Sequence, residues 1–162
     1  MKFFYYIIAF CLVIPIAIQA VYSYSASKVS HHLVPSDTVY SKEISDTLWT
    51  TTHENGEIDL KSTTPLEIIY DLLSNSINKP EDEFGFSKGF SISSLAARSI
   101  LIEHKDLHGH YYNAVAAIWI TNNWTSEQVI ATILDKGLLD SVLNHFPRLQ
   151  KRILIKLRVN LI

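Results

Sequence analysis

Imidazole and carboxylate side chains gather in one short segment of the sequence. His104 and His108 are four residues apart, so on a helix they would share one face, where two imidazoles can bind zinc. Glu103 and His110 lie beside them. However, Gly109 interrupts any helix that would hold such a site, and the order of residues is not H-E-x-x-H. We therefore predict a solvated turn between two helices here, with no metal site and no cofactor.

A second group of carboxylates is the run Glu81-Asp82-Glu83-Phe84. A carboxylate placed in a cleft can serve as a general base. Among the aromatic residues, Trp119 belongs to an apolar helical stripe and is predicted to lie in the core. Trp124 is the candidate for a surface tryptophan that stacks on a sugar ring.

The segment from Asn113 to Lys136 follows the histidines, and its pattern predicts two helices joined by a capped turn. Thr125 and Gln128 form a capping box at the start of the second helix, and Gly137 suits a left-handed cap at its end. Apolar residues recur with helical spacing in both helices. In the first they are Tyr111, Ala114, Val115, Ile118 and Trp119, and in the second Val129, Ile130, Ile133 and Leu134. We expect the two stripes to pack directly on each other.

The order of residues in this segment resembles the third conserved region of the biosynthetic peptidoglycan glycosyltransferases, which occur in class A penicillin-binding proteins and in monofunctional transglycosylases. That region reads approximately R-K-x-x-E-A-L-L-A-L-W-L-E-R-R-L-S-K-E-E-I-L-E-L-Y-L-N, and the match runs without a gap from Asn113, on the glutamate, to Asp135. Upstream, the segment from Gly89 to Ala96 is similar to the family's G-G-S-T-I-T-Q-Q-L-A, with one residue missing. Thr64-Pro65-Leu66, followed by Leu72-Leu73, resembles the helix that leads into the family's first catalytic motif.

The resemblance implies a chemistry whose groups are changed in this chain. Glycan polymerisation by the family uses one carboxylate as general base on the acceptor hydroxyl and other groups to stabilise the leaving lipid pyrophosphate. The family's two glutamate positions fall near Ser76 and on Asn113, which are neutral, and Glu81 lies too close to Gly89 for the family's spacing. The resemblance therefore implies an inactive relative, and the alternative is a minimal active enzyme that uses Glu81 or Glu103. We expect substrate to contact Gly89, Ser91, Arg98 and Trp124.

The N-terminal segment from Phe3 to Val21 carries no charge and follows Lys2. Its nineteen residues are close to the roughly 20 that a helix needs to cross a bilayer. The apolar run is longer than an ordinary signal-peptide core, and the cleavage site at Ala20 is poor. We therefore predict that residues 1–22 form an uncleaved transmembrane anchor, with a cleaved signal peptide as the alternative. The single cysteine, Cys11, lies in this segment, so the rest of the chain has no thiol chemistry.

Residues 23–62 are predicted to form a juxtamembrane linker, because they are rich in Ser, Thr, Tyr and His. Short alternating patches occur at 48–52 and 58–60, and Asn55-Gly56 between them is a hairpin signal. The linker is therefore expected to include a small β-hairpin.

Residues 63–162 are predicted to form one helical domain. Its first helix should run from about Pro65 to Ile77, with Thr64 and Glu67 as a capping box. The next helix should run from about Ser93 to His104.

The last fifteen residues of the chain carry five positive charges and no negative ones, which leaves nine basic against sixteen acidic residues elsewhere. The basic residues are Arg148, Lys151, Arg152, Lys156 and Arg158. A basic amphipathic segment can lie on anionic lipid. The alternative is an ordinary helix or strand that completes the core.

Fold class and function follow from the helices and from the resemblance. We predict a mostly α, truncated lysozyme-like transglycosylase domain, tethered to a bacterial cytoplasmic membrane by a single span and facing the periplasm or cell exterior. The domain is expected to be a cell-wall-associated binding or scaffold module for lipid-linked peptidoglycan precursor or a glycan strand. A further alternative is an interaction subunit of a membrane complex, with another cell-wall or membrane protein as its partner. No nucleic-acid partner is expected.

Overall fold

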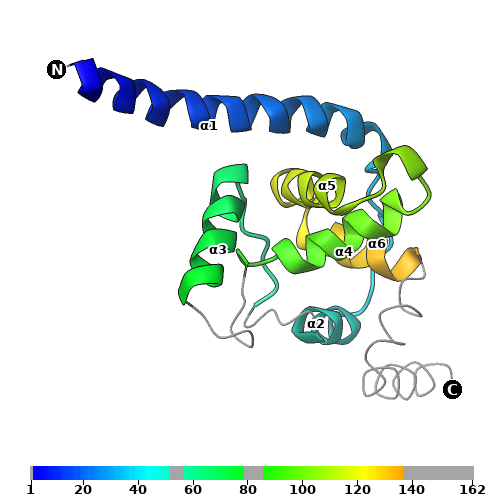
Figure 1. The fold of residues 1–162 in the computed structure, drawn as a ribbon. Helices are drawn as coiled ribbons and strands as arrows, with labels where there is room; N and C mark the ends of the chain where they lie inside the picture. The colour runs from blue at the N-terminus through cyan, green and yellow to red at the C-terminus, as the bar shows by residue number, and fades with distance from the viewer. Residues whose placement is uncertain (1, 52–56, 79–85, 137–162) are drawn as a thin grey trace, which may run out of the picture.

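The computed structural model of the chain describes residues 2–51, 57–78 and 86–136, and of residues 2–11, 51 and 75–78 it describes the backbone alone. Over these residues the fold has six α-helices and no strand, which confirms the prediction of a mostly α protein. The helices are α1 (Lys2–Val29), α2 (Lys42–Thr51), α3 (Pro65–Asn78), α4 (Phe90–Leu101), α5 (His110–Asn123) and α6 (Ser126–Asp135) (Figure 1). Single 3-10 turns occur at Ser30–His32 and Lys105–Leu107.

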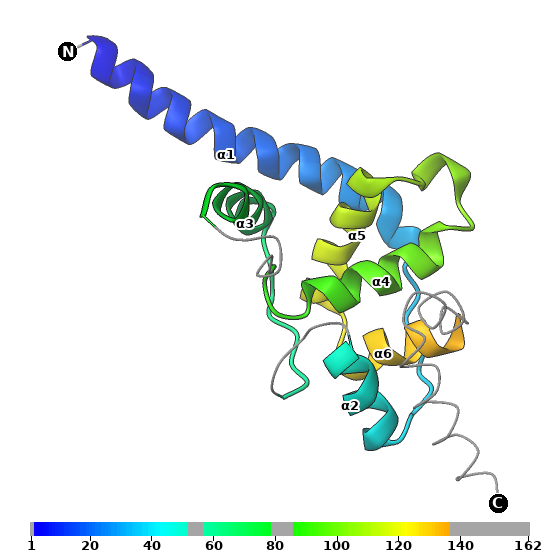
Figure 2. The same ribbon diagram turned by 60° about the horizontal axis from the view of Figure 1, so that its bottom comes forward.

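Helix α4 is the element on which the body is built, because both α5 and α6 pack against it (Figures 1 and 2). Alanines of α4 and α5 are fully buried, and side chains this small let helix axes approach closely. These alanines are Ala96, Ala97, Ala116 and Ala117. Around them lies a main core cluster that includes Ile92, Ile100, Val115, Ile120, Val129, Ile130 and Ile133.

A separate apolar cluster joins α3 to the body. It consists of Ile68 from α3, Phe90 from α4, and Ala117 and Ile118 from α5, with Ala114 packed against it. The expected packing of the α5 stripe directly on α6 is therefore wrong for Ala114 and Ile118. Helix α5 buries every residue from 115 to 118, so it is enclosed on several sides, and one apolar stripe could not identify its neighbours.

Helix α1 extends well beyond the body, and its C-terminal part enters the core (Figures 1 and 2). Ala26 and Val29 enter the main core cluster, and the Ser25 hydroxyl lies 2.6 Å from the Tyr111 hydroxyl of α5. Among the described residues, no helix is both long enough and apolar enough to cross a membrane. The anchor at residues 1–22 stays a prediction from the sequence.

In the described part of residues 23–62, the two patches that were expected to pair as a small hairpin do not form strands. Helix α2 includes the patch from Leu48 to Thr51, residues 58–60 have no regular structure, and Asn55-Gly56 lies outside the described residues. Leu48 and Trp49 are 2% and 1% exposed and belong to the main core cluster. Their burial outweighs the local preference of the neighbouring threonines for strands, because strand preference depends on packing context.

The helix starts were predictable from local sequence. Thr64 and Glu67 form the expected capping box at α3, with Glu67 N donating to Thr64 Oγ1 at 3.2 Å. The backbone hydrogen bond that Glu67 accepts from Thr64 N also lowers the pKa of Glu67. The capping box of Thr125 and Gln128 at α6 is likewise confirmed. Gly137 and the basic segment 148–158 lie outside the described residues.

Helix α4 begins three residues earlier than expected, directly after Gly89. This glycine has a left-handed φ of 85°, a conformation that costs little only without a Cβ atom. A Cβ at Gly89 would also lie 2.6 Å from Leu60 Cδ2. The glycine therefore both turns the chain into α4 and lets the segment before α3 approach it.

The segment between α1 and α2 is held to the end of α6 by one carboxylate, Asp135. Its two oxygens accept hydrogen bonds from the hydroxyls of Ser36, Tyr40 and Thr38. These three bonds, that from Ser36 first, lower the pKa of Asp135, and the bond to Asp135 raises the pKa of Tyr40 to about 12. The backbone N–H of Ser36 also donates to Thr132 Oγ1 at 2.9 Å.

Replacing Ile118 with Asp should unfold the domain. Ile118 is 5% exposed in the cluster that joins α3, α4 and α5, so the new carboxylate would be buried without a partner. We expect a loss of about 3–5 kcal/mol, comparable with the whole stability of a small domain. Denaturant unfolding of the full chain in detergent, followed by circular dichroism, measures it. Val39→Asp, at a 94% exposed position, is the matched control and should be harmless.

Replacing Asp135 with Asn should lower the melting temperature at neutral pH, because three hydroxyls donate to the carboxylate. The folded pKa of Asp135 lies below its ordinary value of 3.8. Its contribution is therefore fully present above pH 3.8 and is lost as the pH falls through the folded pKa. The melting temperatures of the parent and of Asp135→Asn should converge as the pH falls through the folded pKa of Asp135. A difference that persists unchanged at the lowest pH, or one equal to that of the exposed control Asp106→Asn, would contradict this account.

Candidate functional site

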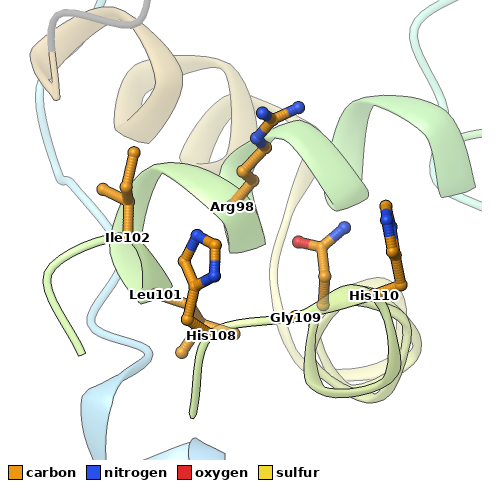
Figure 3. Close-up of a pocket in the computed structure, with 7 residues that line it drawn as sticks. Arg98, Leu101, Ile102, His108, Gly109 and His110 are labelled. Carbon is orange, nitrogen blue, oxygen red and sulfur yellow. The ribbon is translucent and has the colours of Figure 1, made fainter. Parts of the chain in front are cut away.

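A small pocket lies where α4 ends and α5 begins. Its volume is about 220 Å³. The last turns of α4, the connecting loop and the first turn of α5 each contribute side chains (Figure 3). The lining residues are Arg98, Leu101, Ile102, His108, Gly109, His110 and Asn113. The pocket therefore depends on the antiparallel pairing of α4 with α5.

Asn113 places an amide in the wall of this pocket. Its backbone N–H donates to Gly109 O at 3.0 Å, which begins the helical hydrogen bonding of α5. Its side-chain Nδ2 donates to the hydroxyl of Ser94 on α4 at 2.6 Å. Its Oδ1 is buried and has no hydrogen-bond partner. An unpaired buried acceptor is costly, and a ligand hydroxyl or N–H group that reached this oxygen would remove that cost.

The electrostatic character of the pocket is neutral to basic. Arg98 and His108 are exposed side chains at its rim, and Figure 3 shows both extending to the same side of the chain. The first turn of α5 adds free N–H groups and the positive end of a helix dipole. None of the described lining residues is a carboxylate. The arrangement can bind sugar hydroxyls or an anionic group, but it contains no carboxylate general base.

The candidate carboxylates lie elsewhere. Glu103 is exposed and forms an ion pair with Lys136 at 3.5 Å, outside the pocket lining. Glu81 lies outside the described residues. Ser76 belongs to the last turn of α3, and α3 contacts the start of α4 through Ile68 and Phe90. Asn113 lines the pocket, whereas no described residue of α3 does.

Of the four residues expected to contact substrate, the structure places only Arg98 in the pocket. Gly89 and Ser91 lie at the opposite end of α4, where Gly89 is buried against Leu60. The expectation of an exposed Trp124 is wrong, since this side chain is 8% exposed and part of the main core cluster. It follows α5 in an extended conformation, and its burial in the core leaves no face for stacking.

The histidine segment is divided between two environments. His104 lies against the ring of His32, with 4.0 Å between centroids, and is not a pocket residue. His108 and His110 line the pocket instead. Among the described residues, no group of three or more His, Cys, Asp or Glu side chains is placed to hold a metal ion. Sequence spacing could not separate these histidines, because the chain leaves helical geometry after Leu101.

A wider depression of about 840 Å³ lies between α2 and α6, and sequence reasoning missed it. Three exposed carboxylates, Asp46, Glu57 and Glu127, line it together with Lys42 and Tyr40. Each lies at a position to which the glycosyltransferase motifs assign no catalytic glutamate. The residues are far apart in sequence, and no local pattern could have brought them together.

Comparison of the chain with protein-family models, with curated proteins and with solved structures gives no match. Similarity to the glycosyltransferases therefore rests on the sequence motifs alone.

Replacing Asn113 with Asp should leave stability within about 0.5 kcal/mol of the parent. A carboxylate there can accept from the Ser94 hydroxyl and lies in the first turns of α5, where negative charge is favourable. Asn113→Leu, of similar size, removes both hydrogen-bonding groups and should cost about 1–3 kcal/mol. Thermal unfolding of the three proteins in parallel measures both effects. If Asn113→Asp is strongly destabilising, the site excludes too much water to hold a charged side chain.

Proposed function

We propose that this protein is a cell-wall-associated module, anchored in the bacterial cytoplasmic membrane with its domain on the outer side, that binds peptidoglycan glycan without polymerising it. In this proposal the helical body is a truncated, lysozyme-like relative of the peptidoglycan glycosyltransferases. The ligand is the sugar part of a glycan strand or of the lipid-linked precursor.

The observation that carries the proposal is the pocket around Asn113. The position that the motif alignment gives to a family glutamate holds an amide there, and the described lining contains no carboxylate. A neutral amide cannot remove the proton of an acceptor hydroxyl. The same amide has an unpaired acceptor oxygen, so the site retains a means of binding but not of activating its ligand.

The other lining groups suit such a ligand. Arg98 and the imidazoles of His108 and His110 can donate hydrogen bonds to sugar oxygens, to a carboxylate or to a phosphate. Leu101 and Ile102 give the pocket an apolar side, against which the carbon face of a sugar ring can rest. A few polar groups beside an apolar wall are typical of small-ligand sites.

Two alternatives have less support. A minimal enzyme requires Glu81, which lies outside the described residues, or Glu103, whose carboxylate is exposed and paired with Lys136. An interaction subunit of a membrane complex requires an exposed apolar surface, and α3 has one. That surface has a different explanation, which is argued below.

We expect this protein to bind glycan and not to polymerise it. The full chain in lipid nanodiscs should bind fluorescent muramyl glycan fragments and produce no polymer from a lipid-linked disaccharide. Arg98→Ala should weaken binding by roughly 10-fold or more, since a hydrogen bond to a charged group contributes about 1.5–3 kcal/mol. Lys105→Ala removes an exposed cation that lies outside the pocket lining and should have no effect.

Either of two results would overturn the proposal. Polymer formed by the parent and abolished by Glu81→Gln would establish the minimal enzyme. Equal loss of binding in the Arg98 and Lys105 variants would indicate general electrostatic attraction and not a pocket.

A further inference from the structure

Helix α3 turns its apolar stripe outward. Leu66, Ile69, Tyr70 and Leu73 are 44%, 38%, 70% and 60% exposed. Their spacing of i, i+3, i+4 and i+7 places all four on one face of the helix. No charged residue interrupts this face.

The polar groups of α3 are directed elsewhere. Asp71 accepts hydrogen bonds from both the backbone N–H and the hydroxyl of Ser87, at 3.1 and 3.2 Å. Glu67 caps the helix start. Among the described side chains of α3, only Ile68 is buried, at 6% exposure. A surface helix in water normally has the opposite arrangement, with its apolar stripe in the core, so this face indicates an apolar environment outside the body.

The position of α3 relative to α1 identifies that environment. Helix α3 packs beside α1 and lies on the side of the body toward which the N-terminal end of α1 extends (Figures 1 and 2). The two helices run crosswise in Figure 1. Helix α1 also has exposed apolar residues, among them Leu12, Val13 and Ile16. If α1 crosses a bilayer, the axis of α3 would therefore lie along the plane of that bilayer.

We propose that the outward face of α3 lies in the interface of the bilayer in which α1 is anchored. This inference rests on the membrane anchor of the proposed function. The helix lies in the membrane plane, with Leu66, Ile69 and Leu73 in contact with acyl chains. Tyr70 suits the boundary with the head groups, where aromatic side chains with a polar end are enriched. An uncharged apolar face of this kind is what an interfacial helix presents to lipid.

The consequence concerns the pocket. The C-terminal turns of α4 line it, whereas α3 packs against Phe90 at the start of α4, so a membrane that holds α3 would leave the pocket in the aqueous phase. The ligand part that reaches it is then sugar and not lipid tail. This assigns the pocket to glycan, or to the distal sugar of a precursor.

Fluorescent labelling of the full chain tests the contact. Cys11 is the only cysteine, so a Cys11→Ser background accepts single labels. An NBD group is attached at Leu73→Cys on α3, at Leu12→Cys on α1, or at Thr50→Cys, which is exposed on α2 and serves as the control. The proteins are reconstituted in vesicles of phosphatidylcholine and phosphatidylglycerol. We expect the label at 73 to be quenched by lipids with a spin label near the head group, and the label at 50 only by aqueous iodide.

The label at 12 separates this inference from the anchor. If 12 is quenched by lipid and 73 only by iodide, the α3 contact is wrong and the anchor remains. If 73 is quenched by lipid and 12 is not, α3 binds the membrane and the anchor is wrong. Quenching of 73 by neither agent means that protein, such as a second copy, covers α3, which overturns the lipid contact. Iodide quenching at both positions overturns both proposals.

Discussion

The close pairing of α4 with α5 is the constraint on which the rest of this structure depends. Fully buried alanines on both helices allow the backbones to approach, and the loop that joins them must then reverse direction within a few residues. Gly109, with φ of 143°, makes that reversal possible. The pocket is the space left at the end of this helical hairpin, so its shape follows from packing in the core. Helix α6 contacts the same α4 and completes the main cluster.

Features set by neighbouring residues could be predicted from the sequence, whereas those set by distant contacts could not. Both capping boxes involve residues three positions apart, and both formed. Leu48 and Trp49 are buried in a core built from residues far along the chain. The patch that contains them resembles a strand in sequence but is helical in the structure. The burial of Trp124 could not be predicted either, because it also depends on contacts with distant residues. The candidate site was predictable only in part, because Arg98 and Asn113 meet through helix pairing, whereas Gly89 and Ser91 lie at the other end of α4.

The difference between an amide and a carboxylate at Asn113 has chemical consequences beyond the loss of a base. A carboxylate beside Arg98 and the start of α5 would be an acceptor with little capacity to donate. The amide both donates to Ser94 and keeps an acceptor free. The hydrogen-bonding groups of the Asn113 amide need no added proton, so they do not change with pH. Sugar binding of the kind proposed would then require no particular protonation state of residue 113.

The orientation of the pocket relative to α1 follows from how α1 joins the body. Had residues 23–62 been a free linker, the domain could have faced the membrane in any direction. Instead, α1 continues without interruption into the core through Ala26 and Val29, and the next segment is fastened to α6 by Asp135. These contacts hold the body at one angle to α1. If α1 crosses a membrane as proposed, its position there also determines the position of α3 and, through α4, the height of the pocket above the lipid.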